Sequence, residues 1–395
     1  MSDMTTLYNT QATSRAAITR WTDSYFTNTA KCVESDGESM VTYAVFIRSP
    51  SMFAPKMAAE WLKEVAKEGG FNVKLESKFE PGDFVPSGEP QFYISAPLSK
   101  MAECETLFLQ KVGAVAVAAL NAYNSCIELP DTPFIAMGAR HCVGMEMQEM
   151  MDYAASVGSE AAIKNKKAQG FINGASNATS HFFGKSLGTG TMPHALIGYY
   201  GATLPAAQAF RKQCPDKPFT VLVDFNGKEI SDAIEVAQHF PKEAADGTLG
   251  FRLDTHGGRY LEGLDHQKSI DVLNQNAPGI LSQNWDESEE KILIGPGVSV
   301  ANIWHFKNEL AKAGFPNVGC IGSSGFGPKK CRIMNLAKAP LTGVGTGSYI
   351  PKDFDATYAT ADIFEYDGDY KIKVGREYLG ERYKESRKAS ELKIL

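Results

Sequence analysis

The feature that most constrains the fold is a repeated alternation between residues 134 and 349, where short apolar runs are followed by polar or glycine-rich turns and then by helical patterns. We interpret the apolar runs as strands at 134–139, 169–173, 186–191 (the weakest), 219–225, 249–254, 291–295, 318–322 and 341–345. Strands that alternate with helices favour parallel βα units. Eight units over roughly 215 residues predict a barrel of the (β/α)8 size, with a doubly wound open sheet as the alternative.

The segment before this region mixes the two periodicities. Alternating apolar residues at 41–47 and 91–96 predict strands, and the pattern at 56–68 is typical of an amphipathic helix. The loop at 79–90 is rich in Pro and Gly, and the long apolar run at 101–123 predicts a buried helix. Together these patterns indicate a mixed sheet packed against helices.

The last segment contains two alternating runs joined by Asp367-Gly368, which is a strong hairpin signal, and we expect the hairpin to join the N-terminal sheet. A length of 395 residues favours about two or three domains. We therefore expect an N-terminal α+β domain at 1–130, a barrel-like domain at 131–350, and a C-terminal segment at 351–395 that returns to the N-terminal domain.

Composition excludes several classes of function. Forty Lys and Arg against 46 Asp and Glu give a net charge of −6, which argues against a nucleic-acid partner. Seven scattered cysteines without a C-x-x-C pair predict reduced thiols. No run of 18 apolar residues occurs, and the first 15 residues lack the apolar stretch of a secretory signal. We expect no membrane partner and a cytoplasmic location.

In a βα barrel the reactive groups lie where the strands end. Polar residues and glycines lie at or just after the ends of the predicted strands: Arg140, Ser176, Asn177, His194, Asp224, Arg252, Asp254, Gly295, Gly297, Ser323, Ser324, Gly325, Gly345 and Thr346. Small residues let backbone N–H groups approach an anion, and helix N-termini add positive dipole ends. The pattern predicts a phosphate pocket, although glycines that only turn the chain would give the same spacing.

Other nucleotide and metal motifs are missing from the sequence. The turn at 343–348 lacks the third glycine spacing of G-x-G-x-x-G, and Thr179 stands where a Walker A loop has its first glycine. The histidines form no i, i+4 pair and have no Cys partner, so we expect no metal site built by the protein. Asp224 and Asp254 end apolar strands and need a cation or hydroxyl partner. Mg2+ carried in by a phosphorylated substrate would serve.

Short segments spread along the chain match one family in order. TDSY at 22–25 is similar to its T-D-x-Y, and MGAR at 137–140 to its F-G-x-R with Met137 in place of the aromatic residue. The other matches are GASN at 174–177, GTMPH at 190–194, VD at 223–224, RLDT at 252–255, and the glycine segments 294–298 and 322–325. Phe225 and Asn226 depart from the family's V-D-T-Y-D. With these segments the chain resembles the nicotinate phosphoribosyltransferases and their nicotinamide-using relatives, the type II phosphoribosyltransferases.

The resemblance implies an incomplete (β/α)8-like barrel with an N-terminal α+β domain, assembled as a head-to-tail homodimer with shared active sites. Tyr25 would stack on the pyridine ring from the neighbouring subunit, and Arg140 would meet the anionic groups of the ligand. His194 corresponds to the active-site histidine, which is transiently phosphorylated in relatives that use ATP. The two glycine segments would hold ribose and 5′-phosphate.

The implied reaction joins nicotinate to C1 of 5-phosphoribosyl-1-pyrophosphate (PRPP) and gives nicotinate mononucleotide and pyrophosphate, a step of NAD biosynthesis. Positive charge develops on the ribose in such a step, so Asp224 and Asp254 would suit ribose and Mg2+, while Arg140 and Arg252 would anchor anions. Coupling to ATP is left open.

Three alternatives remain at this stage. Relatives that prefer nicotinamide place an aspartate where this chain has Ser176, so the neutral side chain favours nicotinate, although a serine there could instead cap a helix. A relative that uses quinolinate would need a denser set of Arg and Lys for the second carboxylate. The third alternative is a barrel that binds a phosphosugar or nucleotide without catalysis.

Overall fold

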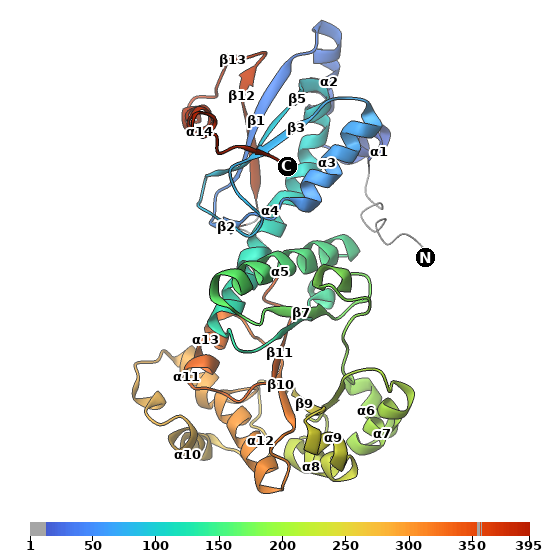
Figure 1. Cartoon of the computed structure of the whole chain (residues 1–395), viewed down its shortest axis with the longest axis vertical. Helices are drawn as coiled ribbons and strands as arrows, with labels where there is room; N and C mark the ends of the chain where they lie inside the picture. Colours follow the sequence, from blue (N-terminus) through green and yellow to red (C-terminus); the bar gives the residue numbers. More distant parts are fainter. Residues whose placement is uncertain (1–12, 354–355, 357) are drawn as a thin grey trace. The chain divides into compact units, whose positions relative to one another are not determined.

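The computed structural model describes residues 13–353, 356 and 358–395, and the expectation about a secretory signal rests mostly on residues outside this part. The chain divides into two compact units, which Figure 1 shows together. Unit 1 comprises Met1–Leu120 and Pro351–Leu395, and unit 2 comprises Asn121–Ile350.

Unit 1 is built on an antiparallel sheet, not the predicted mixed one, with the strand order β13-β12-β1-β5-β3-β14. The bounds are β1 (Met40–Ile47), β3 (Lys74–Ser77), β5 (Pro90–Pro97), β12 (Ala359–Tyr366), β13 (Asp369–Tyr370) and β14 (Lys393–Ile394). The predicted hairpin is confirmed, because β12 and β13 pair antiparallel around Asp367 and Gly368, which both have positive φ. β12 also pairs antiparallel with β1, so the hairpin extends this sheet.

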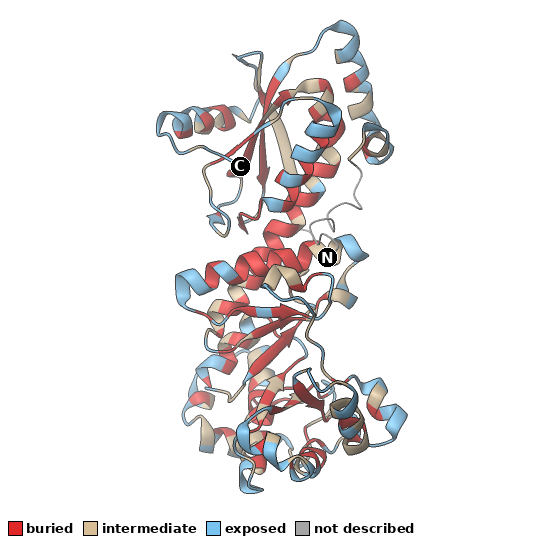
Figure 2. Cartoon of the chain, turned by 45° about the vertical axis from the view of Figure 1, so that its right-hand side comes forward, coloured by how far each residue is buried: buried red, intermediate tan, exposed pale blue. Residues whose placement is uncertain are grey.

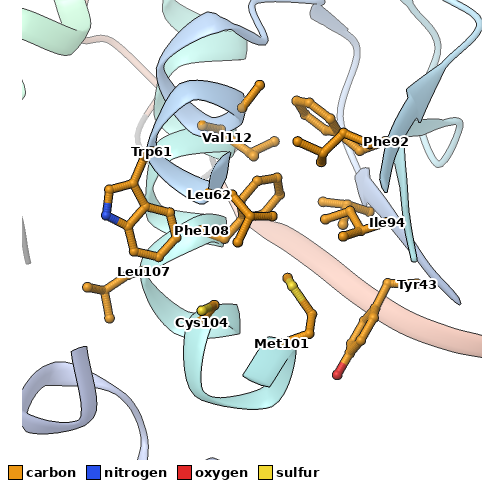
Figure 3. Packing of buried hydrophobic residues seen from close by; sticks show 14 of the residues in the cluster. Tyr43, Trp61, Leu62, Phe92, Ile94, Met101, Cys104, Leu107, Phe108 and Val112 are labelled. Atoms are coloured by element: carbon orange, nitrogen blue, oxygen red, sulfur yellow. The ribbon is translucent and has the colours of Figure 1, made fainter. Parts of the chain in front are cut away.

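Both faces of the unit 1 sheet are covered. Tyr43 and Val45 of β1 lie in a cluster with the helices α3 (Lys56–Gly69) and α4 (Leu98–Glu128), which Figure 3 shows from close by. Phe46 points to the other face and packs with Phe364 and with α14 (Glu377–Lys388). The remaining elements are α1 (Arg15–Trp21), α2 (Ser24–Asp36) and the small pair β2 (Ser51–Met52) and β4 (Phe84–Val85).

The helix α4 is long and apolar enough, by length and composition, to cross a membrane. A buried core helix meets the same criteria, and 67% of the most apolar window of α4 is buried inside the structure. It confirms the buried helix that the run at 101–123 predicts.

Unit 2 contains a parallel sheet with the order β7-β6-β11-β10-β9-β8. The strands are β6 (Phe134–Ala136), β7 (Phe171–Gly174), β8 (Phe219–Leu222), β9 (Leu249–Leu253), β10 (Gly319–Gly322) and β11 (Gly343–Thr346). β6 lies beside β11, so the first and last strands of the unit meet as in a barrel. β7 and β8 follow one another in the chain yet form the two edges, so the barrel is incomplete, as predicted.

Helices surround these strands (Figure 1), and the strands are mostly buried (Figure 2). The helices are α5 (Met145–Lys166), α6 (His194–Tyr200), α7 (Thr203–Gln213), α8 (Glu229–His239), α9 (Pro241–Asp246), α10 (His266–Asn276), α11 (Glu287–Ile294), α12 (Val300–Lys312) and α13 (Pro328–Leu336). Short 3-10 helices occur at Ala139–His141, Ser180–Phe183 and Ile280–Ser282.

Two of the eight predicted strands are wrong. The segment 186–191 forms no strand, and 291–295 lies at the end of α11. Asp286 and Glu289 form a capping box that starts this helix, so the apolar residues after it continue a helix already begun. A short apolar run has no periodicity that separates a buried strand from a buried helix.

Candidate active site

A cavity of about 510 Å3 lies in unit 2 at the carboxyl ends of the parallel strands. Eight of the predicted site residues line it: Arg140, His194, Arg252, Asp254, Ser323, Ser324, Gly325 and Gly345. They lie in the last residues of β9 and β11 or in segments that follow β6, β7, β9 and β10, which are far apart in the sequence. Parallel strands bring these segments together because all their carboxyl ends lie at one edge of the sheet.

His194 is paired with a carboxylate. It is the first residue of α6, and its Nε2 lies 3.0 Å from Oδ2 of Asp224, which follows β8. A carboxylate accepts, so this contact assigns a hydrogen to Nε2, and in the neutral tautomer the lone pair is then on Nδ1. The imidazole is 45% exposed, whereas the Asp224 side chain is only 7% exposed. His194 can therefore contact a ligand while the buried Asp224 carboxylate holds the imidazole ring in place.

A second charged group lies on β9. Arg252 is partly buried, and burial lowers its pKa, while the nearby carboxylates of Asp254 and Asp224 oppose that effect and Arg140 adds to it. A guanidinium remains charged in proteins. Two polar atoms here are buried and have no partner in the described part of the chain, Nε of Arg252 and Oδ1 of Asp224. Because unpartnered buried polar atoms are costly, they favour a ligand that supplies both donors and acceptors.

The turn after β10 has an unusual backbone. Ser324 and Gly325 have φ of 78° and 69°, in the left-handed region that few serines adopt. The side chain of Ser323 donates to the Leu253 carbonyl at 3.1 Å, and Nζ of Lys330 donates to the Ser324 carbonyl at 2.8 Å. These two hydrogen bonds therefore stabilise the left-handed conformation of the turn at the cavity wall.

Sequence reasoning did not select Lys330. Burial lowers the pKa of its ammonium to about 8. Its Nζ also lies over the Phe326 ring, 4.4 Å from the centroid. A signal existed, since Lys330 belongs to the same glycine-rich segment at 321–330, but a lysine in the first turn of a helix is usually solvated.

Two cavity glycines lie close to Met137, Gly345 to its side chain and Gly347 to its backbone. A Cβ on Gly345 would lie 2.6 Å from Sδ of Met137, and a Cβ on Gly347 would lie 2.3 Å from the Met137 carbonyl oxygen. Gly295 and Gly297 do not line the cavity. A Cβ on Gly295 would lie 2.6 Å from the Lys291 carbonyl oxygen, and Gly297 has φ of 82°. The predicted role of Gly295 and Gly297 in ligand binding stays a prediction.

Three predicted residues lie beside the cavity without lining it. Oγ of Ser176 accepts from Thr179 at 3.4 Å, Oδ1 of Asn177 accepts from the Gly188 N–H at 2.9 Å, and Thr346 donates to the Phe326 carbonyl at 2.6 Å. Ser176 caps no helix, because the 3-10 helix that follows begins at Ser180 after Thr179. This observation removes the capping alternative for Ser176.

The side chain of Asp152 holds the turn that contains Ser176 and Thr179. Its buried carboxyl accepts from Thr179 at 2.5 Å, and burial raises its pKa to about 6.

Tyr25 belongs to unit 1, on α2, and is 61% exposed. Its hydroxyl donates to Asp23 at 3.4 Å. It lines a larger hollow of about 820 Å3 together with Glu105, whose pKa burial raises to about 8. No glycine lines this hollow, unlike the unit 2 cavity, and the predicted contact of Tyr25 with a pyridine ring stays a prediction.

The donor set limits which cations this chain can hold. The described residues contain no group of three His, Cys, Asp or Glu side chains suited to a metal. The unpartnered Oδ1 of Asp224 and the cavity carboxylate of Asp254 fit a weaker arrangement, in which Mg2+ arrives bound to a phosphorylated substrate.

The fold and the cavity define a class of architecture, a TIM-like barrel joined to an α+β unit with a polar cavity at the strand ends. No family model and no curated protein sequence matches the chain. Several solved structures share the fold. One is nicotinate-nucleotide pyrophosphorylase from Pyrococcus furiosus, with 22% identity, a TM-score of 0.67, and coverage of 90% of this chain and 78% of that chain.

Two further structures extend this comparison. Human nicotinic acid phosphoribosyltransferase has 13% identity and a TM-score of 0.54, over 90% of this chain and 76% of that chain. NadC from Streptococcus pyogenes has 13% identity and a TM-score of 0.53, over 90% and 95%. The likeness covers both units, and at these identities it establishes the fold.

Proposed function

We propose that this protein is a phosphoribosyltransferase of NAD biosynthesis that transfers the phosphoribosyl group of PRPP to nicotinate. The observation that carries the proposal is the His194–Asp224 pair at a cavity whose walls also hold Arg140, Arg252 and Asp254. The fold likeness supports it, since two of the compared structures are a nicotinate-nucleotide pyrophosphorylase and a nicotinic acid phosphoribosyltransferase. A cytoplasmic homodimer is part of the proposal.

In the proposed reaction the lone pair of the pyridine nitrogen forms a bond to C1 of PRPP. The C1–O bond breaks, and pyrophosphate leaves with the electron pair. Positive charge develops on the ribose, so Asp254, which lines the cavity, and Asp224, which is bonded to His194, would lower the barrier. The two arginines would hold the anionic groups, and Mg2+ would enter with the pyrophosphate of the substrate.

The proposal includes coupling to ATP through His194. With the hydrogen on Nε2 held by Asp224, the Nδ1 lone pair can attack the terminal phosphorus of ATP. The bond to the bridging oxygen then breaks, and ADP leaves with its electrons. The resemblance to ATP-using relatives supports this step, and the exposure of the ring allows it.

Quinolinate is the second candidate substrate. The specific observation that favours it is the positive charge around the cavity, where Arg140 and Arg252 line the wall and Lys330 anchors the Ser324 turn. A second carboxylate would use such charges. The His194–Asp224 pair favours nicotinate, because the proposed reaction with quinolinate has no step that would use a phosphorylated histidine.

One assay separates these substrates. The purified protein receives PRPP and Mg2+ with nicotinate, nicotinamide or quinolinate, each with and without ATP, and pyrophosphate release is measured. We expect release with nicotinate, increased by ATP. Release of pyrophosphate together with carbon dioxide from quinolinate would support the second candidate substrate. No release of pyrophosphate with any pyridine would indicate a protein that binds such ligands without catalysis.

His194→Ala is the matched variant for this assay. We expect it to lower turnover by about a hundredfold or more and to abolish stimulation by ATP, because it removes the nucleophile. The ring is nearly half exposed, so the unfolding midpoint should stay close to that of the natural protein. A variant that loses stability but keeps its turnover would contradict the role of His194.

A further inference from the structure

We infer that Arg259 is a positioning residue that holds Asp224, and through Asp224 the ring of His194, in the geometry that the reaction uses. Arg259 lies in the loop after β9 and does not line the cavity. The inference rests on the proposed function only for the role of His194, because the contacts themselves are independent of the substrate.

One guanidinium nitrogen of Arg259 makes the decisive contacts. Its Nη2 donates to the main-chain carbonyl of Asp224 at 2.9 Å and also to the carboxylate of Glu229. Its Nη1 donates to the Tyr260 carbonyl at 3.2 Å, and its own carbonyl accepts from the Gly297 N–H at 2.9 Å. Arg259 therefore joins the segments after β8 and β9 to the turn before α12.

Glu229 also holds the guanidinium of Arg259, at the same nitrogen that donates to the Asp224 carbonyl. It is the first residue of α8 and is fully buried. Besides Arg259, its carboxylate accepts from Thr255 Oγ1 at 3.1 Å and from the Glu262 N–H at 3.3 Å. Removing one partner of a buried ion pair leaves an uncompensated charge, so the pair is kept together.

Asp224 needs such an anchor. In the described part of the chain its carboxylate has a single hydrogen-bond partner, His194, since Oδ1 has none. The direction of the carboxylate therefore depends on its backbone. Among the described residues, only Arg259 and, at a longer distance of 3.4 Å, the Gly227 N–H donate to the Asp224 carbonyl. Displacements of about 1 Å at a catalytic group can lower rates about a hundredfold.

The test is Arg259→Lys, observed by 15N NMR of the histidine rings in the full chain without substrate. Lysine keeps the charge beside Glu229 but lacks the planar fork that also reaches the Asp224 carbonyl. We expect the natural protein to show the His194 hydrogen on Nε2. In Arg259→Lys the spectrum should move toward that of Asp224→Ala, with His194→Gln assigning the signals. Where activity is measurable, kcat should fall about tenfold or more at a nearly unchanged KM for PRPP.

Arg211→Lys is the matched control. Arg211 also joins a carboxylate, Glu243 at 3.6 Å, to a carbonyl, that of Pro215 at 2.9 Å, and none of these residues lines the cavity. It should leave the His194 signal unchanged. If Arg259→Lys lowers the unfolding midpoint but leaves the His194 signal as in the natural protein, the inference is overturned.

If Arg259→Lys does not fold, Glu229→Gln provides a second test of the inference. The amide still accepts from Arg259, so we expect the His194 signal to move in the same direction by a smaller amount, and an unchanged signal would overturn the inference. A displaced signal in a protein that releases no pyrophosphate with any pyridine would contradict the proposed function and support the role of Arg259.

Discussion

At the scale of single residues, the sequence predicts groups that end strands better than groups that support them. Arg140, Arg252 and Asp254 lie at the ends of predicted strands, and all three line the cavity. His194 also lines it, although the segment 186–191 before it forms no strand. Arg259 and Glu229 were not predicted, because their partners are about 30 residues away and no local pattern marks the contact. Long-range supporting contacts become visible only when the fold is known.

Ser176 is the residue that should decide between pyridine substrates. Its side chain is neutral and accepts from Thr179, and Ser176 directly follows Ala175, which lines the cavity. We expect Ser176→Asp to lower kcat/KM for nicotinate about a hundredfold, since two carboxylates about 4 Å apart in a partly desolvated site repel by a few kcal/mol. The KM for PRPP should change little.

Ser176→Asn is the control for this comparison, because it has the shape of aspartate without the charge. Equal losses in the two variants would assign the effect to shape. Comparable use of nicotinate and nicotinamide by the natural protein would also contradict the assignment.

Asp152 gives stability a definite dependence on pH. Burial raises its pKa from 3.8 to about 6, so between these values the unfolded chain releases a proton that the folded chain keeps. Its contribution therefore becomes less favourable as pH rises from about 4 to about 6. We expect Asp152→Asn, which can still accept from Thr179, to gain on the order of 2 kcal/mol at pH 7.5 relative to pH 4.

Denaturant unfolding at the two pH values measures this gain. Glu160→Gln, an exposed change on the same helix, is the control and should show no such difference. An equal effect of Asp152→Asn at both pH values would show that the folded carboxyl is not held protonated.

At the scale of elements, the sequence predicts six strands of the parallel sheet, the late hairpin and the long buried helix. It fails at 291–295, where the capping box of α11 decides the structure although the apolar residues alone favour a strand. The same limit applies to glycines, because spacing alone does not show whether a missing side chain makes room for a ligand or for the chain itself.

Gly347 and Gly325 are examples of a glycine that makes room for the chain itself and of one that faces open space. A Cβ on Gly347 would meet backbone atoms of Met137, whereas a Cβ on Gly325 meets nothing within 4 Å. We expect Gly347→Ala to destabilise unit 2 by on the order of 3 kcal/mol, since the backbone cannot rotate away. Gly325→Ala should cost only about 1 kcal/mol, for its left-handed φ. Urea unfolding compares the two, and equal costs would contradict the packing role of Gly347.

At the scale of the whole molecule, the proposed shared site predicts complementation between subunits. Tyr25 lies in unit 1 and His194 in unit 2. If Tyr25 serves the cavity of a second copy, mixing Tyr25→Ala with His194→Ala should restore one intact site in each hybrid dimer. We expect activity to recover to roughly a quarter of the natural level after random exchange of subunits, in which half of the dimers are hybrids.

Tagged subunits purified in two steps verify the hybrids. The matched control is a mixture of His194→Ala with Asp224→Ala, which both fall in the same unit and should give no recovery. Verified hybrids of Tyr25→Ala and His194→Ala without activity would exclude a shared site.

The path of the chain through the two units also has a consequence for its synthesis. Unit 2 is one continuous segment, but the central strand β1 of unit 1 pairs with β12, which is translated about 320 residues later. We expect the barrel to fold on the ribosome while one edge of β1 is still unpaired. An open strand edge attracts other chains, so the nascent N-terminal segment would depend on chaperones until its last strand emerges.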